Sequence, residues 1–272
     1  MRYAQVKYMQ RVLLGLALLA FTATSIADTK LNDGTVLSDS PAWIVTYIEV
    51  AVETADEAAA LIAAQSAASR KDTGSLYFEG LQRVAQKNHF VVLEAWTSPD
   101  ARAEHAAAVH TQSYRKALQP LLYAPYDERP HVGLEAIAPQ EIPKADDATI
   151  FVLTHADIIP PEQFAPCNRR PDPAGPCGND LLTNLSKASR AHNGNLRFDV
   201  LTQSNRGNHM TVVEMWDSSA TQAAHQTHLD KKNFRDELAG IEAGSGVSGD
   251  PQFLLNMMTG SLWDERLYRL ID

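Results

Sequence analysis

Two stretches of the chain place the same chemically capable residue types at the same spacing. The motifs HFVVLEAW and HMTVVEMW begin at positions 89 and 209, and a histidine stands nine positions after the tryptophan of each, as His105 and His225. A histidine whose pKa lies near neutrality can act as a general base, and the motif glutamates, Glu94 and Glu214, are placed to orient it. We predict these four residues as catalytic. The alternative is that they pack and hydrogen-bond where sheet and helix meet.

Aromatic residues in and around the two motifs are candidates for substrate binding, because an electron-rich aromatic molecule stacks well on such rings. The candidates are Trp96, Trp216, Tyr47, Tyr77, Tyr114 and Phe234. For the two tryptophans the alternative is a place in the hydrophobic core. The three tyrosines have no tyrosine at the matching positions further along the chain, so they favour the first motif if one site alone is active.

Metal-binding patterns are incomplete in this sequence. His225 and His228 lie three residues apart on one helix face, but no third ligand is evident. His105 and His110 are five residues apart and do not share a helix face. We therefore predict no metal site and no cofactor.

The two cysteines, Cys167 and Cys177, bracket a proline-rich loop. In an oxidising compartment this arrangement predicts a disulfide, which would contribute about 3 kcal/mol at most for so short a loop. The alternative is a metal site, which two thiolates with no nearby histidine support poorly.

Both motifs belong to a repeat with an offset of 120 residues. Matching residues extend from Gly74 and Gly194 through the two motifs. Upstream, residues 43–50 match residues 149–156 at an offset of about 106, which indicates an insertion of about 14 residues around the cysteines. Two copies with one long loop indicate a duplicated domain, because a solenoid would have a shorter period and more copies.

Each copy has the same predicted order of elements, β-α-β-β-α-β, which is ferredoxin-like. Patterning and capping signals place the elements of the first copy at 43–50, 53–74, 75–84, 89–96, 98–122 and 130–137. The closing strand of the second copy is predicted at 251–258, because Pro251 matches Pro130 at an offset of 121.

Both faces of the strand at 89–96 are largely apolar, so helices on one face leave the other uncovered. Each copy can supply the missing cover for the other. We therefore predict an α+β fold: two ferredoxin-like (βαββαβ) repeats that form an intramolecular pseudo-dimeric α+β barrel. The predicted parts are a signal peptide at 1–27, domains at 42–137 and 148–258, a linker at 138–147, and a C-terminal tail at 259–272 that docks on its own barrel or, alternatively, on a second chain.

The first residues have the pattern of a secretory signal peptide. Arg2, Lys7 and Arg11 precede an apolar run at 12–23, which is too short to span a bilayer comfortably, and small residues precede Asp28. An uncleaved anchor is the alternative. Cleavage leaves 21 basic and 33 acidic residues, a net charge of −12, which disfavours nucleic acid and anionic membranes as partners. We expect a periplasmic or secreted protein that is a monomer with an internal pseudo-dimer or a weak homo-oligomer.

The pattern Glu-x-Trp followed by the helix histidine resembles the antibiotic biosynthesis monooxygenase family, which belongs to the dimeric α+β barrel superfamily. The resemblance covers roughly residues 42–137 and 148–258. It implies a small cavity between sheet and helices in each copy, and oxidation of a small quinol or phenol by O₂ without metal or flavin. Haem-degrading relatives have a haem-ligating histidine where this chain has Arg115 and Arg235, so haem degradation is disfavoured.

We therefore predict a cofactor-independent monooxygenase whose partner is a small aromatic or apolar molecule. The alternative is a non-catalytic periplasmic module that binds such a ligand, and a structural role is a third reading.

Overall fold

The computed structural model describes residues 29–30, 36–37, 42–134, 137, 142–157, 178–243 and 263–271. In chain order its helices and strands are β1 Thr29–Lys30, β2 Val36–Leu37, β3 Ala42–Glu49, η1 Val52–Thr54, α1 Ala55–Ser69, β4 Ser75–Arg83, β5 His89–Trp96, α2 Pro99–Ala107, α3 Val109–Leu118, η2 Gln119–Leu121, β6 Asp127–Gly133, β7 Ile150–Asp157, α5 Gly178–Arg190, β8 Asn195–Gln203, β9 Arg206–Trp216, α6 Ser219–Gln226, α7 Leu229–Ala243 and β10 Trp263–Leu270. The elements from β3 to β6 are called the first repeat, and those from β7 to β10 the second repeat.

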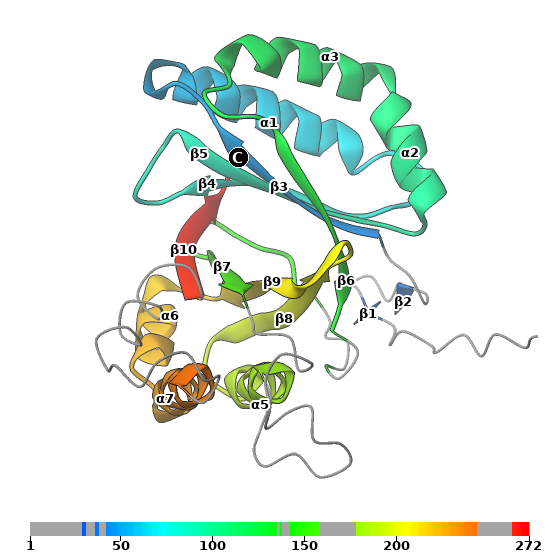
Figure 1. Ribbon diagram of the computed structural model, residues 1–272. Coiled ribbons are helices and arrows are strands. Elements are labelled where there is room, and N and C mark those ends of the chain that lie inside the picture. The colour runs from blue at the N-terminus through cyan, green and yellow to red at the C-terminus, as the bar shows by residue number, and fades with distance from the viewer. Residues whose placement is uncertain are drawn as a thin grey trace, which may run out of the picture.

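The strands of the two repeats close into one antiparallel barrel in the order β10-β4-β5-β3-β6-β8-β9-β7 (Figure 1). The repeats join at two places, where β6 pairs with β8 and where β10 pairs with β4. The helices lie outside, with α1, α2 and α3 over one sheet and α5, α6 and α7 over the other. The predicted fold, two ferredoxin-like repeats in an intramolecular α+β barrel, is therefore confirmed.

The barrel interior is a hydrophobic cluster drawn from both repeats. Val45 and Leu93 of the first repeat and Leu153 and Val213 of the second are at most 2% exposed. Burying an apolar side chain of this size stabilises the fold by roughly 1.5–3 kcal/mol. Each sheet therefore gains its stability on one face from its own helices and on the other face from the opposite repeat. No helix among the described residues is both long and apolar enough to cross a bilayer.

The closing strand of the second repeat lies further along the chain than the predicted 251–258. The segment 259–272, predicted as a docking tail, contains β10, which pairs with β7 and takes the position that β6 holds beside β3. Glu128 lies opposite Thr46 and Glu265 opposite Thr154, so β6 and β10 correspond at an offset of 137. The match of Pro130 to Pro251 was therefore wrong, because a second insertion lies before β10.

Several predicted features fall outside the described residues. They are the signal peptide at 1–27, the closing strand at 251–258, and the cysteine pair Cys167 and Cys177.

The helix predicted over 98–122 is two helices. Ser98 begins α2 as its N-cap, with Oγ accepting the Ala101 N–H at 3.1 Å. Ala108 adopts an extended conformation, with ψ at 145°, so α2 ends and α3 starts in a new direction (Figure 1). A similar break separates α6 from α7. Residue spacing on one continuous helix therefore does not predict which side chains of residues 98–122 are in contact.

Replacement of Tyr268 by Ala tests whether β10 is part of the core. Tyr268 is 1% exposed in the interior cluster, so Tyr268→Ala should lower the free energy of unfolding by about 3–5 kcal/mol. Tyr123 is 77% exposed, so the matched change Tyr123→Ala should stay within about 0.5 kcal/mol. Urea unfolding measures both, and equal effects would contradict the closure of the barrel by β10.

Candidate active site

A cavity of about 320 Å³ lies between the sheet and the helices of the first repeat. Its walls include Phe78 of β4, Glu94 of β5, His105 of α2, and Thr111 and Tyr114 of α3. Three residues predicted as site residues, at positions 94, 105 and 114, therefore lie around one space. The break between α2 and α3 is what allows both helices to contribute to the wall.

His105 is held on two sides. Its ring stacks on the indole of Trp96, with ring centroids 4.4 Å apart and 28° between planes. Its Nδ1 donates to Asp72 Oδ2 at 2.7 Å. Burial lowers the pKa of His105 below the usual 6.5, while the hydrogen bond and charge of Asp72 oppose this change. In the neutral ring Nε2 carries the lone pair and lies 3.5 Å from the Thr111 hydroxyl, while Asp72 fixes the orientation of the ring.

Glu94 was predicted to orient His105, but the contacts described for its carboxylate are to Trp96 and Arg102. Its Oε2 accepts the indole N–H of Trp96 at 2.9 Å and lies 4.0 Å from Arg102 Nε. Burial raises the pKa of Glu94, and Arg102 opposes this effect. Arg102 also pairs with Glu128. Glu94 is thus part of a charged network at the cavity wall, and Asp72 is the residue that sequence reasoning missed.

A buried lysine lies beside the corresponding glutamate of the second repeat. At an offset of 120, Lys231 stands in the place of Thr111, and it is fully buried. Its Nζ lies 3.3 Å from Glu214 Oε1 and also pairs with Glu265. Burial raises the pKa of Glu214, and Lys231 opposes this effect. The second repeat therefore keeps both glutamates of the first. The cation paired with them is Lys231 on α7, whereas in the first repeat it is Arg102 on α2.

His225 repeats the position of His105 with different electrostatics. Its ring stacks on Trp216, with centroids 4.5 Å apart and 27° between planes. Burial lowers the pKa of His225 to about 2, and the charge of Lys231 adds to this effect. The symmetric stacking is thus retained, but a histidine this hard to protonate is a poor base.

Two groups of histidine and aspartate atoms lie close enough to share a cation in the described part of the chain. They are Asp72, His105 and His110, and His192, His228 and Asp230. At an offset of 120, Asp72 corresponds to His192 and His110 to Asp230, so the two residue types have exchanged places between the repeats. The helix breaks bring these side chains together. Residue spacing along a helix therefore did not show that these side chains meet. The exchange of histidine and aspartate between matching positions is the sequence signal that could have shown it.

The other predicted aromatic residues are distributed more widely. Trp96 and Trp216 are fully buried. Tyr77 lies inside the barrel, with its ring 6.1 Å from Trp43. Phe234 packs on Trp263 at 4.7 Å in the second repeat. None of these four side chains lines the cavity beside His105, as defined by the residues that form its walls.

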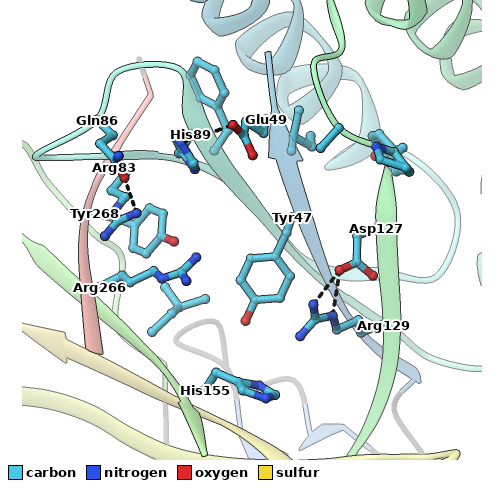
Figure 2. Close-up of a pocket in the computed structure, with 16 residues that line it drawn as sticks. Tyr47, Glu49, Arg83, Gln86, His89, Asp127, Arg129, His155, Arg266 and Tyr268 are labelled. Atoms are coloured by element: carbon cyan, nitrogen blue, oxygen red, sulfur yellow. Dashed lines mark hydrogen bonds and ion pairs between the residues drawn. The ribbon is translucent and has the colours of Figure 1, made fainter. Parts of the chain in front are cut away.

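Tyr47 lies in a second, larger cavity of about 710 Å³ where the two repeats meet (Figure 2). Figure 2 shows its ring between Arg129 and Arg266, with His155 on the far side. The two arginines occupy matching positions, and each pairs with the aspartate two residues before it. These two charges are therefore paired, whereas Arg83, a third arginine of the cavity wall, bonds to the neutral side chain of Gln86.

The family model described as Antibiotic biosynthesis monooxygenase matches residues 41–117 and 179–237. The match covers the motif, the histidine and the first turns of the following helix in both repeats. No curated protein matches the sequence significantly.

Solved structures share the fold over most of the chain. A proposed monooxygenase of Fusobacterium nucleatum is 13% identical, with a TM-score of 0.64 over 85% of this chain and 93% of that one. A proposed monooxygenase of Lactobacillus acidophilus is 11% identical, with a TM-score of 0.58 over 86% of this chain and 95% of that one. An anthrone oxidase-like protein is 13% identical, with a TM-score of 0.55 over 86% of this chain and 92% of that one.

Replacement of Lys231 tests whether it neutralises the buried glutamates. Lys231→Met leaves Glu214 and Glu265 without their shared cation, so the free energy of unfolding should fall by about 3–5 kcal/mol. Adding Glu214→Gln to this variant should recover part of the loss. The neighbouring Lys232 has a side chain that is 68% exposed, and Lys232→Met should cost less than about 1 kcal/mol. Urea unfolding of the variants decides, and a stable Lys231→Met protein would contradict the buried ion pairs.

Proposed function

The chain belongs to the antibiotic biosynthesis monooxygenase family, and from this premise we propose that it is a cofactor-independent monooxygenase that oxidises a small phenol or quinol with O₂. The reaction takes place in the cavity of the first repeat. The observation that supports this most is His105, which lines the cavity with Nδ1 bound to Asp72.

The size of the cavity favours a small substrate. A volume of about 320 Å³ lies at the lower end of ligand pockets, which range from roughly 300 to 1,000 Å³. One aromatic ring with O₂ beside it suits such a space. Phe78 and Tyr114 supply apolar and aromatic wall, and the charges of Arg102 and Arg115 at the same wall are paired with Glu128.

The chemistry needs one proton acceptor and a dry space. His105 Nε2 takes the phenolic proton, and Asp72 stabilises the resulting imidazolium. The phenolate passes one electron to O₂, and the phenoxyl and superoxide radicals combine at a ring carbon. The peroxide formed takes up the proton from His105, and loss of water leaves a quinone. One oxygen atom enters the product, the other leaves as water, and the substrate supplies all four electrons.

Only the first repeat is expected to turn over substrate. The space beside His225 holds Lys231, which is buried and paired with Glu214. We also propose that the leader at 1–27 exports the chain, and that the mature protein works outside the cytoplasm as a monomer with an internal pseudo-dimer.

Matched histidine variants test the proposal and its location. His105→Gln should lower O₂ consumption with a panel of phenols and hydroquinones by roughly 10²–10⁴-fold, the usual contribution of a general base. His225→Gln, the same change at the matching position, should retain activity within a few-fold. Oxygen-electrode rates with both proteins, checked for folding by circular dichroism, give the comparison.

The outcome also separates the enzyme from a binding module. If the wild-type protein binds phenols but consumes no O₂, and His105→Gln binds them equally well, the non-catalytic module is the correct reading. Equal losses from the two histidine variants would instead contradict the assignment to the first repeat.

The pH dependence of turnover should reflect His105. Because the ring must be unprotonated to accept a proton, kcat/KM should fall at acid pH, with a midpoint below 6.5 since burial lowers the pKa of His105. Asp72 raises this pKa, so Asp72→Asn should move the midpoint to still lower pH and also reduce kcat. A midpoint that stays in place or moves upward would contradict the role of Asp72 as the positioning residue.

A further inference from the structure

The interior of the barrel ends at the larger cavity, the one of about 710 Å³ where the two repeats meet (Figure 2). Three residues of its wall, Tyr47, Leu153 and Tyr268, belong to or pack against the interior hydrophobic cluster. The cavity is thus a barrel mouth, a common place for small ligands, and its volume lies within their usual range of roughly 300–1,000 Å³. It is separate from the cavity beside His105, and only Tyr126 lines both.

Strand register brings cationic and aromatic side chains together on this wall. Arg83 of β4 lies directly opposite Tyr268 of β10, and Arg266 stands two residues before Tyr268. Residues paired across two strands, or two apart along one strand, point to the same face of a sheet. The first repeat adds Tyr47 of β3 and Arg129 of β6. Three guanidinium groups and two phenol rings therefore face one space, as Figure 2 shows.

The aspartates that pair with Arg129 and Arg266 hold only one edge of each guanidinium. Asp127 Oδ2 accepts a hydrogen bond from Arg129 Nε at 2.9 Å and another from Nη2. Asp264 Oδ2 accepts from Arg266 Nε at 2.8 Å and also from Nη2. The Nη1 end of each arginine has no carboxylate partner in the described part of the chain. The aspartates therefore fix both arginines in place and leave N–H donors at the cavity wall.

Arg83 is the arginine of this wall that has no acidic partner among the described residues. Its Nη1 donates to the amide oxygen of Gln86, which is neutral. At an offset of 120 the second repeat has Gln203 at this position, so the equivalent hairpin forms without an arginine there. Folding therefore does not explain the positive charge of Arg83, and a negatively charged ligand does.

Two phenol hydroxyls supply neutral donors beside these arginines. Burial raises the pKa of Tyr268 to about 12 and also raises the pKa of Tyr47, and the charge of Arg266 opposes both effects. Both hydroxyls therefore stay protonated at neutral pH and can donate to an anionic oxygen. Their rings form an aromatic wall, and the guanidinium carbon of Arg129 lies 4.6 Å from the ring centroid of Tyr47.

The carboxylates of the wall limit how much negative charge a ligand can bring. They are Asp127, which pairs with Arg129, and Glu49, which lies 3.7 Å from His89. A single negative charge matches the one arginine without an acid, whereas a dianion such as phosphate is repelled by these two carboxylates. A planar carboxylate also fits the fork of a guanidinium.

We propose that this cavity binds a small molecule with one carboxylate group and one aromatic ring. Arg83 and the Nη1 end of Arg266 hold the carboxylate, and the ring lies against Tyr47 and Tyr268. The side chain of Arg266 is 36% exposed, so a ligand from solution reaches it. This site is independent of the cavity in which we place phenol oxidation.

Calorimetric titration of the mature chain with benzoate tests the site. Benzoate has the ring and the carboxylate but no phenol, so it is not a substrate of the proposed oxidation. One equivalent should bind with a Kd below about 1 mM. Benzyl alcohol, which lacks the charge, should bind at least roughly tenfold more weakly, and inorganic phosphate should also bind more weakly than benzoate.

Matched variants locate the bound benzoate. Arg83→Gln, which introduces the residue found at position 203, should weaken binding roughly 10- to 100-fold, the usual effect of losing a charged hydrogen bond. Arg206→Gln is the control, because Arg206 is exposed in the equivalent hairpin and outside the cavity wall, and it should bind benzoate as the wild type does. Tyr47→Leu, which introduces the residue of the matching position 153, should weaken binding by roughly 2- to 10-fold.

Three results would overturn the proposal. The first is a wild-type protein that does not bind benzoate at millimolar concentration, or binds phosphate or benzyl alcohol more tightly. The second is unchanged affinity in Arg83→Gln. The third is binding that His105→Gln abolishes and Arg83→Gln retains, because it places benzoate in the other cavity. Circular dichroism checks folding, and if Tyr47→Leu unfolds, Arg83→Gln decides, since Arg83 is partly exposed at the end of β4.

Discussion

The structure depends on one constraint: each sheet is apolar on two faces, and its own helices can cover only one. The second face is buried when the sheets of the two repeats meet, with Val45 and Leu93 against Leu153 and Val213 in one cluster. Backbone pairing follows the same logic, because β6 and β10 each bond to a strand of the opposite repeat. A closed ring of strands leaves no unpaired edge among them. The site is positioned by this arrangement, since it fixes β4 and β5 beneath α2 and α3.

Joining the two copies in one chain has allowed their interiors to diverge. Both repeats bury a glutamate that accepts an indole N–H, Glu94 and Glu214, and both supply a cation to it. The cation comes from Arg102 in one case and from Lys231 in the other. The side chain of Arg102 lines the cavity of the first repeat, whereas that of Lys231 is fully buried and paired with Glu214 and Glu265. The two repeats thus differ in which helix supplies the cation to the buried glutamate, α2 in the first and α7 in the second.

The fold could be predicted because the repeat offset and the pattern of apolar residues in the strands are both visible in the sequence. The repeated motif at an offset of 120 and the two apolar faces of β5 led to the barrel. The closing strand could not be placed in the same way, because a second insertion changes the offset to 137. The signal was nevertheless in the sequence, since Asp-Glu-Arg occurs at 127–129 and again at 264–266. The role of Asp72 depends on the extended backbone of Ala108, and helical periodicity contains no information about such a break.

The pairing of β10 with β4 has a kinetic consequence. Arg83 of β4 and Tyr268 of β10 are partners on adjacent strands although most of the chain separates them. Contacts between such distant residues require the chain to lose much of its freedom before they form, which slows folding. Until that contact is made, β4 and β10 are strands with open edges, and open edges invite association with other chains. Folding of this molecule should therefore end with a slow ring-closing step whose success depends on dilution or on assistance from a chaperone.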